Sequence, residues 1–265
     1  MRFDFGPHLP PPWRRVETGG GRVEAGEGWL RLVNVATTAH VYTNAQIDDY
    51  HGLPRRRFPR RPPLTLTVQA RFSTPDPPGT AGFGFWNEPL TRYGDRLPAL
   101  PQALWFLYTS PPSHIPLAVG VPGCGWKAAV LDARRPAALA LAPTGPAALL
   151  LLNLPGCYRR LWPFYQRALG VAETVLTIDK TTWHTYQIVW GRRRVRLRVD
   201  NEDVLTAPAP PGPLGLVVWL DNQYLIATPW GRLRSGLLAA AEERYLEIAR
   251  LEVTPSLPAG DESNG

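Results

Sequence analysis

A strand with one charged face and one apolar face is the feature that most constrains this fold. From Arg192 to Arg198 every second residue is an arginine, and the positions between and after them are Arg193 and then three apolar residues ending at Val199. Alternation with a period of two is typical of a β-strand with one buried face. The turn-forming residues Asp200–Asp203 follow directly, and Asn and Asp tolerate the backbone angles of a tight hairpin. We therefore expect an antiparallel hairpin whose arginines face solvent near a sheet edge.

Further strand patterns extend along most of the chain. With 265 residues, of which 44% are hydrophobic, the chain predicts one large all-β domain over residues 1–254. Residues 1–27 read as an extended arm, and residues 255–265 as a disordered tail. The other expected strands are Trp29–Val35, Leu64–Ser73, Ala81–Asn87, Gln102–Thr109, Ile115–Val121, His184–Trp190, Val204–Thr206, Leu214–Asp221 and Tyr245–Val253.

One segment, residues 136–175, interrupts the β pattern. It is rich in Ala and Leu, poor in β-branched residues and punctuated by Pro and Gly, which predicts an insertion with two short helices near 146–153 and 158–169. Pro163 is tolerated in the first turn of a helix, which favours a later start for the second helix. Two interpretations are open: a helical cap packed on the sandwich, or a lid or interfacial helix over an apolar site.

Two parts of the chain resemble a known superfamily. The run Trp183–Trp190 (WHTYQIVW), the basic strand and Val199–Glu202 are similar to the C-terminal half of concanavalin A-like lectin/glucanase domains, as in laminarinase- and lichenase-type glycoside hydrolases. Tyr42–Asp48 followed by Leu64–Ser73 resembles the early paired strands of that fold. The resemblance covers roughly residues 28–118 and 176–254, and implies a concanavalin A-like jelly-roll β-sandwich. That fold carries lectins, hydrolases and inert modules alike.

The resemblance also directs attention to a missing motif. Hydrolases of this fold carry Glu-x-Asp-x-x-Glu on one strand, and a one-residue bulge brings the outer two carboxylates to one face, about 5 Å apart. At the corresponding strand Ala103, Trp105 and Tyr108 occupy these positions, and no Asp or Glu lies between Asp95 and Asp132. The usual mechanism is therefore not expected here. Aromatic side chains in its place suit stacking on a sugar ring.

Our first hypothesis is a glycan-binding or non-catalytic glucanase-like protein. Tryptophan and tyrosine supply ring faces, while Asp, Asn and Gln supply directional donors and acceptors for hydroxyl groups. The expected groove is lined by Trp86, Asn87, Trp105, Tyr108, Trp219, Asp221, Asn222, Gln223 and Tyr224.

Two alternatives stay open. One is a glycoside hydrolase or other enzyme that takes acid and base groups from different strands, with Asp48, Asp49, Glu88 and Asp221 as candidates. For Asp48 and Asp49, turn chemistry or an arginine partner in the following basic loop is the competing structural interpretation. The other alternative is an apolar-ligand or membrane-surface protein that uses the Leu-rich insertion.

The basic balance of the chain favours acidic partners. The formal net charge is +7, and only Lys127 and Lys180 are lysines. One loop holds five arginines, which are either solvated or contact anionic glycans, phosphates or lipid. They are Arg55, Arg56, Arg57, Arg60 and Arg61.

Motifs for other classes of partner are missing from the sequence. No dinucleotide fingerprint, phosphate loop or specific nucleic-acid motif is found, and no His or Cys spacing suits a metal, so no cofactor is expected. The first residues contain no apolar signal-peptide core and no apolar run reaches the length of a membrane span, which predicts a cytoplasmic protein. Free thiols at Cys124 and Cys157 are then favoured over a disulfide.

Overall fold

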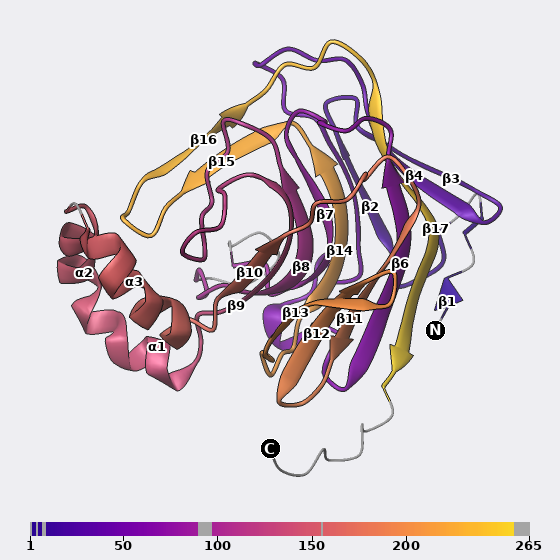
Figure 1. The fold of residues 1–265 in the computed structure, drawn as a ribbon. Coiled ribbons are helices and arrows are strands. Elements are labelled where there is room, and N and C mark those ends of the chain that lie inside the picture. Colours follow the sequence, from indigo (N-terminus) through magenta and orange to yellow (C-terminus); the bar gives the residue numbers. More distant parts are fainter. Residues whose placement is uncertain (1, 4, 7–8, 90–96, 155, 257–265) are drawn as a thin grey trace.

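The chain folds into a β-sandwich, as its strand patterns predict. A computed structural model describes residues 2–3, 5–6, 9–89, 97–154 and 156–256. Two antiparallel sheets of eight and seven strands pack face to face, with a separate two-stranded ribbon at one end (Figure 1). Of the predicted disordered tail, residues 257–265 lie outside the described part of the chain.

The eight-stranded sheet contains the charged hairpin. Its order is β13-β12-β11-β6-β17-β4-β3, and β1 also pairs with β17. The predicted hairpin is confirmed: β12 lies next to the edge strand β13, and Asp200 and Asn201 form the turn with φ of 50° and 71°. The apolar side chains of β12 are buried, and its arginines lie on the other face. The strands are β1 (Arg2–Phe3), β3 (Arg22–Gly26), β4 (Trp29–Asn34), β6 (Leu64–Phe72), β11 (His184–Trp190), β12 (Arg194–Val199), β13 (Glu202–Pro208) and β17 (Arg244–Pro255).

The seven-stranded sheet has the order β10-β9-β8-β7-β14-β5-β2. Its strands are β2 (Arg14–Thr18), β5 (Asn44–Asp48), β7 (Thr80–Trp86), β8 (Gln102–Thr109), β9 (Gly125–Asp132), β10 (Ala172–Val175) and β14 (Gly215–Asp221). The ribbon consists of β15 (Gln223–Ala227) and β16 (Leu233–Leu237), and η1 (Arg55–Arg57) is a short 3-10 helix. The expected arm of residues 1–27 is wrong in part, because it contributes β2 to this sheet and β3 to the other.

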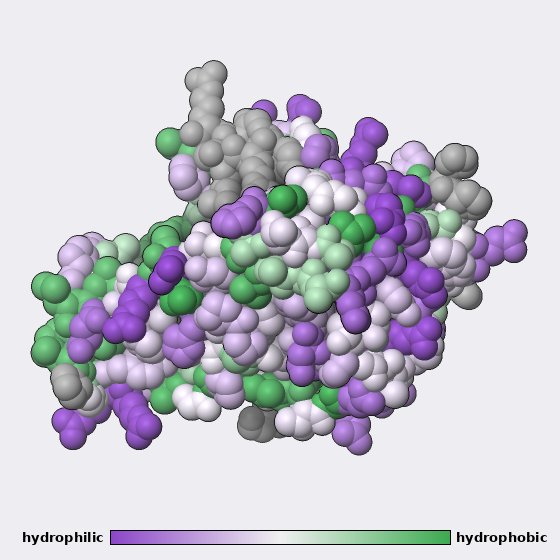
Figure 2. Space-filling view, turned by 90° about the horizontal axis from the view of Figure 1, so that it is seen from above, coloured by the Kyte–Doolittle hydropathy of each residue, from purple (hydrophilic) through white to green (hydrophobic). Residues whose placement is uncertain are grey.

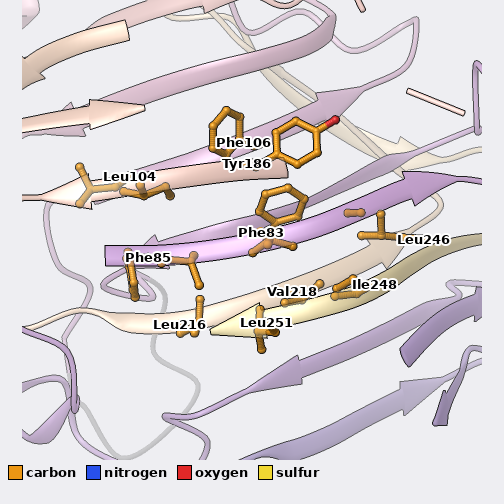
Figure 3. Packing of buried hydrophobic residues seen from close by; sticks show 14 of the residues in the cluster. Phe83, Phe85, Leu104, Phe106, Tyr186, Leu216, Val218, Leu246, Ile248 and Leu251 are labelled. Atoms are coloured by element: carbon orange, nitrogen blue, oxygen red, sulfur yellow. The ribbon is translucent and has the colours of Figure 1, made fainter. Parts of the chain in front are cut away.

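The core lies between the two sheets and is rich in aromatic rings (Figure 3). Phe83 and Phe106 from one sheet meet Tyr186 from the other, with ring centroids 5.1 and 5.0 Å from that of Tyr186. Burying each such ring contributes roughly 1.5–3 kcal/mol relative to leaving it exposed. The rings therefore fix which face of the seven-stranded sheet points inward.

The helical insertion differs in detail from its prediction. It forms α1 (Pro136–Leu141), η2 (Ala142–Thr144), α2 (Gly145–Leu152) and α3 (Cys157–Ala168) at one end of the molecule, where Figure 1 shows the ribbon reaching toward them. The expected late start of the last helix is wrong, because α3 begins at Cys157 and continues through Pro163. The proline removes one helical hydrogen bond, and burial of Trp162 and Ala168 against the sandwich holds the helix in place. Residues 172–175 belong to the sheet as β10.

Two further expectations concern single features of the chain. The strand predicted at Ile115–Val121 is wrong, since this segment is an irregular loop. Cys124 and Cys157 are both free thiols and half-buried. Within the described residues, none of the helices has both the length and the apolar character needed to cross a bilayer.

Candidate functional site

Three tryptophans form a row across the outer face of the seven-stranded sheet. Trp86 lies on β7, Trp105 on β8 and Trp219 on β14, and all three are half-buried. The neighbours of each in its strand point the other way, into the core. The ring of Trp105 lies between the other two, with centroids 6.1 Å from Trp86 and 5.9 Å from Trp219. We call these residues the tryptophan row.

Two glycines of β7 leave room for these rings. Gly82 faces Trp219 in the sheet register, and a Cβ at Gly82 would lie 2.9 Å from the Trp219 ring. Gly84 has a φ of 151°, and a Cβ there would lie 2.2 Å from the carbonyl oxygen of Leu104. A side chain at either position would clash with these atoms, so only glycine fits at both. The alternating glycines of β7 thus set the spacing of the row.

The strand β8 has neither the carboxylates nor the bulge of the glucanase motif described above. Its register with β7 and β9 runs from end to end without a shift, so it contains no bulge. Without a bulge, Ala103, Trp105 and Leu107 point to the outer face. Tyr108 points into the core, where it is only 2% exposed and its ring lies 5.8 Å from that of Phe72. The placement of Tyr108 in the groove is therefore corrected: its side chain is on the opposite face.

Other side chains pack beside the tryptophan row on two sides. On one side Tyr50 and Phe58 cover Val217, and the Tyr50 hydroxyl accepts a 2.6 Å hydrogen bond from the indole of Trp86. On the other side the loop of residues 115–122 lies over the buried pair Lys127 and Glu173. These contacts leave the row as the half-exposed strip between two covered parts of the same face.

The two asparagines predicted to contact a ligand instead tie loops together. The side-chain oxygen of Asn87 accepts a bond from the Gln102 backbone, and its nitrogen donates to the carbonyl of Leu100. Asn222 accepts from the backbone of Thr43 and donates to two backbone carbonyls. Both are at most 1% exposed. Their hydrogen-bonding capacity is taken up by the fold, so we assign them structural roles.

Gln223 and Tyr224 lie at the start of β15, where the chain leaves the sheet for the ribbon. Both are half-buried. The Gln223 backbone N–H donates to the carboxylate of Asp221, and the ring of Tyr224 covers Gly236 on β16. The structure therefore places them beyond the Trp219 end of the row, on a different element.

The adjacent residues Asp48 and Asp49 show both of the structural roles considered for them. Asp48 is fully buried and accepts hydrogen bonds from the backbone N–H groups of Tyr50 and His51, closing a turn. Asp49 accepts from the side chain of Arg60 at 2.6 Å and from the backbone of Leu216 at 2.8 Å. Burial raises the pKa of both carboxyls, and Arg60 opposes the rise at Asp49.

The remaining two candidate carboxylates are also buried. Glu88 is 4% exposed and has a positive φ of 42°, and its backbone carbonyl accepts a bond from Arg55. Asp221 accepts hydrogen bonds from the backbone and the hydroxyl of Thr80 and from the backbone of Gln223. The hydroxyl of Thr80 in turn accepts from the indole of Trp219. Asp221 thus supports one end of the tryptophan row.

The spacing of Asp48 and Asp221 along the sheet does not suit glycoside hydrolysis. In the register of β5 and β14, Asp48 is opposite Val217, while Asp221 is opposite Asn44, four residues along the strand. At about 3.3 Å per residue the two backbones are roughly 13 Å apart. Glycosidase pairs lie about 5–5.5 Å or 6.5–9.5 Å apart, depending on stereochemistry. Asp48 and Asp221 therefore do not form such a pair.

Burial of Asp221 predicts a pH-dependent stability. Desolvation raises its folded-state pKa to about 6, from 3.8 in the unfolded chain. The folded state then binds more protons between these values, so the free energy of unfolding falls as pH rises from about 4 to 6, by about 2–3 kcal/mol. Asp221→Asn keeps the acceptor oxygen and should remove this contribution. Urea unfolding of both proteins at pH 4 and pH 7 measures it; a constant difference between them would contradict the prediction.

A basic cavity of about 640 Å³ lies beyond the Trp86 end of the row. Asn87 follows β7, Arg134 follows β9 and Pro213 precedes β14, so all three belong to the same end of the sheet. The described residues that line the cavity include four arginines and no carboxylate. The arginines are Arg55, Arg56, Arg61 and Arg134.

Three contributions to this face were not anticipated from the sequence. Tyr50, Arg134 and the Lys127–Glu173 pair come from segments far apart in the chain. Only Lys127 carried a local signal, as one of two lysines and the single charge within the run Gly125–Leu131. Among the described residues, no group of three or more His, Cys, Asp or Glu side chains is arranged to hold a metal ion.

Comparisons with known proteins give similarity in structure alone. No protein-family model matches the chain, and no curated protein matches it. A GlcNAcα1-4Gal-releasing endo-β-galactosidase from Clostridium perfringens is similar with a TM-score of 0.53 and 10% identity, over 94% of this chain and 59% of that one. An immunostimulatory antigen and pseudo β-1,3-glucanase of Mycobacterium tuberculosis gives 0.51 and 10%, over 95% and 96%. A legume lectin-like domain from Entamoeba histolytica gives 0.50 and 10%, over 97% of both chains.

These identities are low, so the likeness concerns the fold. It agrees with the two packed antiparallel sheets and with the hairpin at Asp200–Asn201. The chain has the concanavalin A-like lectin/glucanase fold.

Proposed function

We propose that this protein binds a glycan on its tryptophan row and does not hydrolyse it. The observation that carries the proposal is the position of Trp105 on β8, where its ring is the central one of three half-exposed rings. The sequence resemblance to laminarinase- and lichenase-type hydrolases implies that the catalytic carboxylates of those enzymes lie on the corresponding strand. Flat aromatic faces offer sugar rings a large apolar contact area at low entropic cost. The row therefore offers a surface for binding a sugar chain at the place where the hydrolases would carry out their reaction.

The names of the structural neighbours support a carbohydrate ligand. One is named as an endo-β-galactosidase, one as a pseudo β-1,3-glucanase and one as a legume lectin-like domain. A non-catalytic role is favoured by the candidate carboxylates of this chain, because Asp48, Asp49 and Asp221 are each enclosed by hydrogen-bond donors of the fold. General acid–base work requires a group within reach of the substrate.

Titration of tryptophan fluorescence with neutral and acidic polysaccharides tests the proposal, with product analysis of the same samples. We expect a saturable shift and no cleavage products. Cleavage that is lost when Asp48, Asp49, Glu88 and Asp221 are all replaced by their amides would refute the non-catalytic role and favour the enzyme alternative. Absence of a shift with every glycan would refute binding at the row.

The basic cavity predicts a preference for acidic glycans. Arg56, Arg61 and Arg134 line it with exposed side chains, next to the Trp86 end of the row. A glycan that extends from the row past Trp86 would bring its carboxylate or sulfate groups close to these guanidinium groups, which bind such groups in bidentate fashion. We expect tighter binding of acidic than of neutral polysaccharides, with a difference that shrinks as salt is added.

Single substitutions show whether the cavity arginines or the net charge of the chain cause the preference for acidic glycans. Arg56→Gln and Arg134→Gln should each reduce the preference for acidic glycans about three- to tenfold, and leave binding of neutral glycans unchanged. Arg57 is the matched control, because it is exposed in the same short helix but does not line the cavity. An equal effect of Arg57→Gln would show that net charge, and not the cavity, selects the ligand.

A further inference from the structure

Two segments at one end of the molecule carry an excess of positive charge. The two segments 133–172 and 222–241 contain seven arginines and no Asp or Glu, and the formal net charge of the whole chain is +7. The remaining residues are therefore neutral on balance. The first segment is the helical insertion with its flanking residues, and the second contains the β15–β16 ribbon. We call the two together the arginine–leucine module.

Contacts between the two segments make the module one surface. The side chain of Asn153, at the end of α2, donates a 2.9 Å hydrogen bond to the carbonyl of Trp230 at the ribbon tip. The ring of Tyr158 on α3 packs edge-on against Trp230, with centroids 5.0 Å apart. Leu149 on α2 lies against Gly231. The helices and the ribbon tip thus support one another.

The module also exposes large apolar side chains. Leu150 is 74% exposed and Leu233, at the start of β16, is 80% exposed. Figure 2 shows hydrophobic side chains gathered at the end of the molecule that carries the helices, with hydrophilic ones among them. The exposed apolar residues of the module are Leu139, Leu149, Leu150, Leu151, Leu154, Phe164 and Leu233. A clustered apolar patch of this kind marks an interaction site more often than scattered single residues do.

We infer that the arginine–leucine module docks on the surface of a bilayer that contains anionic phospholipids. Apolar side chains enter the boundary of the acyl chains, while Arg159, Arg160, Arg232 and Arg234, all exposed, pair with lipid phosphates. The absence of carboxylates from both segments is what this partner requires, since each would be repelled by the lipid charge. The module lies on different elements from the tryptophan row. Arg134 and Leu139, at its edge, also line the basic cavity, but Leu150, Arg159 and Arg160 do not, so variants of these three residues test the inference separately from glycan binding.

Co-sedimentation of the full chain with vesicles tests the inference. The probes are vesicles of phosphatidylcholine alone and of phosphatidylcholine with phosphatidylglycerol. We expect binding to the anionic vesicles, weaker binding to the neutral ones, and loss of the difference at high salt. Each arginine near an anionic surface strengthens partitioning about fivefold, so Arg159→Gln/Arg160→Gln should weaken it about 25-fold. Leu150→Glu should weaken it about tenfold or more.

Two controls keep the result specific. Leu97 is 75% exposed and lies outside the module, so Leu97→Glu should bind vesicles like the unmodified protein. Trp105→Ala should also keep vesicle binding, and Leu150→Glu should keep glycan binding, which separates this inference from the proposed function. Equal binding of the unmodified protein to both kinds of vesicle, or undiminished binding of the module variants, would overturn it. Absence of binding to either kind of vesicle would also overturn it, and would indicate an acidic protein partner in place of a bilayer.

Discussion

Trp105→Ala should weaken glycan binding by at least about thirtyfold, which corresponds to about 2 kcal/mol or more, as for aromatic residues at the centre of binding sites. The substitution removes the middle ring of the row and leaves Trp86 and Trp219 on either side of a gap. A sugar chain that stacks on all three rings would then lose its continuous platform. Isothermal titration calorimetry with the glycan that gives the strongest fluorescence shift measures the change.

Two matched variants show whether the effect belongs to the row. Trp183 is 38% exposed and stacks under Arg71 away from the row, so Trp183→Ala should bind glycans as the unmodified protein does. Trp105→Phe keeps an aromatic face and should recover most of the affinity. Circular dichroism and urea unfolding check that each variant is folded. Unchanged affinity in folded Trp105→Ala would exclude the row as the glycan site.

The sequence predicts an element correctly where its signal is strong and local. The hairpin β12–β13 combines a strict period of two with Asp200 and Asn201 at positive φ, and each signal is local. The strand β9 was missed, because Lys127 interrupts its apolar run. The remaining sequence then lacks the alternation that is typical of a half-buried strand. The segment 115–121 has the composition of a strand, but its backbone is bonded to side chains of other elements.

The candidate site shows the same difference between features with a local sequence signal and features set by tertiary contacts. The three tryptophans were expected at a groove because the chain has more large aromatic residues than a core of this size needs. That they share one face follows from the pairing of β7 with β8 and β14. The inward direction of Tyr108 follows from the absence of a bulge in β8, which is a property of pairing with β7 and β9 and not of the residues themselves. Asn87 and Asn222 bond to backbone groups brought near by folding, and no sequence pattern reports such groups.

The covered side of the outer face depends on one buried ion pair. The ammonium group of Lys127 contacts the carboxylate of Glu173 and donates to the backbone carbonyls of Ile115 and Pro122, both at 3.0 Å. Glu173 also accepts a bond from the backbone of Ala118. Both side chains are 1% exposed. The pair thus anchors the 115–122 loop on the sheet beside the tryptophan row, and supplies hydrogen bonds to a loop that has few of its own.

Lys127→Met should therefore lower the free energy of unfolding by about 3–5 kcal/mol, because it leaves the Glu173 carboxylate buried without its partner. Urea unfolding followed by tryptophan fluorescence measures this loss. Glu173→Leu should lower the free energy of unfolding by a similar amount, because it leaves the Lys127 ammonium group buried without its partner. The double variant removes both charges, so its loss should be smaller than the sum of the single losses by about 2 kcal/mol or more.

The double variant also separates the stability of the fold from the position of the loop. Apolar side chains can fill the space of the ion pair, but they cannot bond to the carbonyls of Ile115 and Pro122 or to the N–H of Ala118. We expect the double variant to regain stability while the 115–122 segment becomes more accessible to proteolysis and to hydrogen exchange. Additive losses in the cycle, or unchanged protection of this segment, would show that packing against α3 holds the loop and that the ion pair does not.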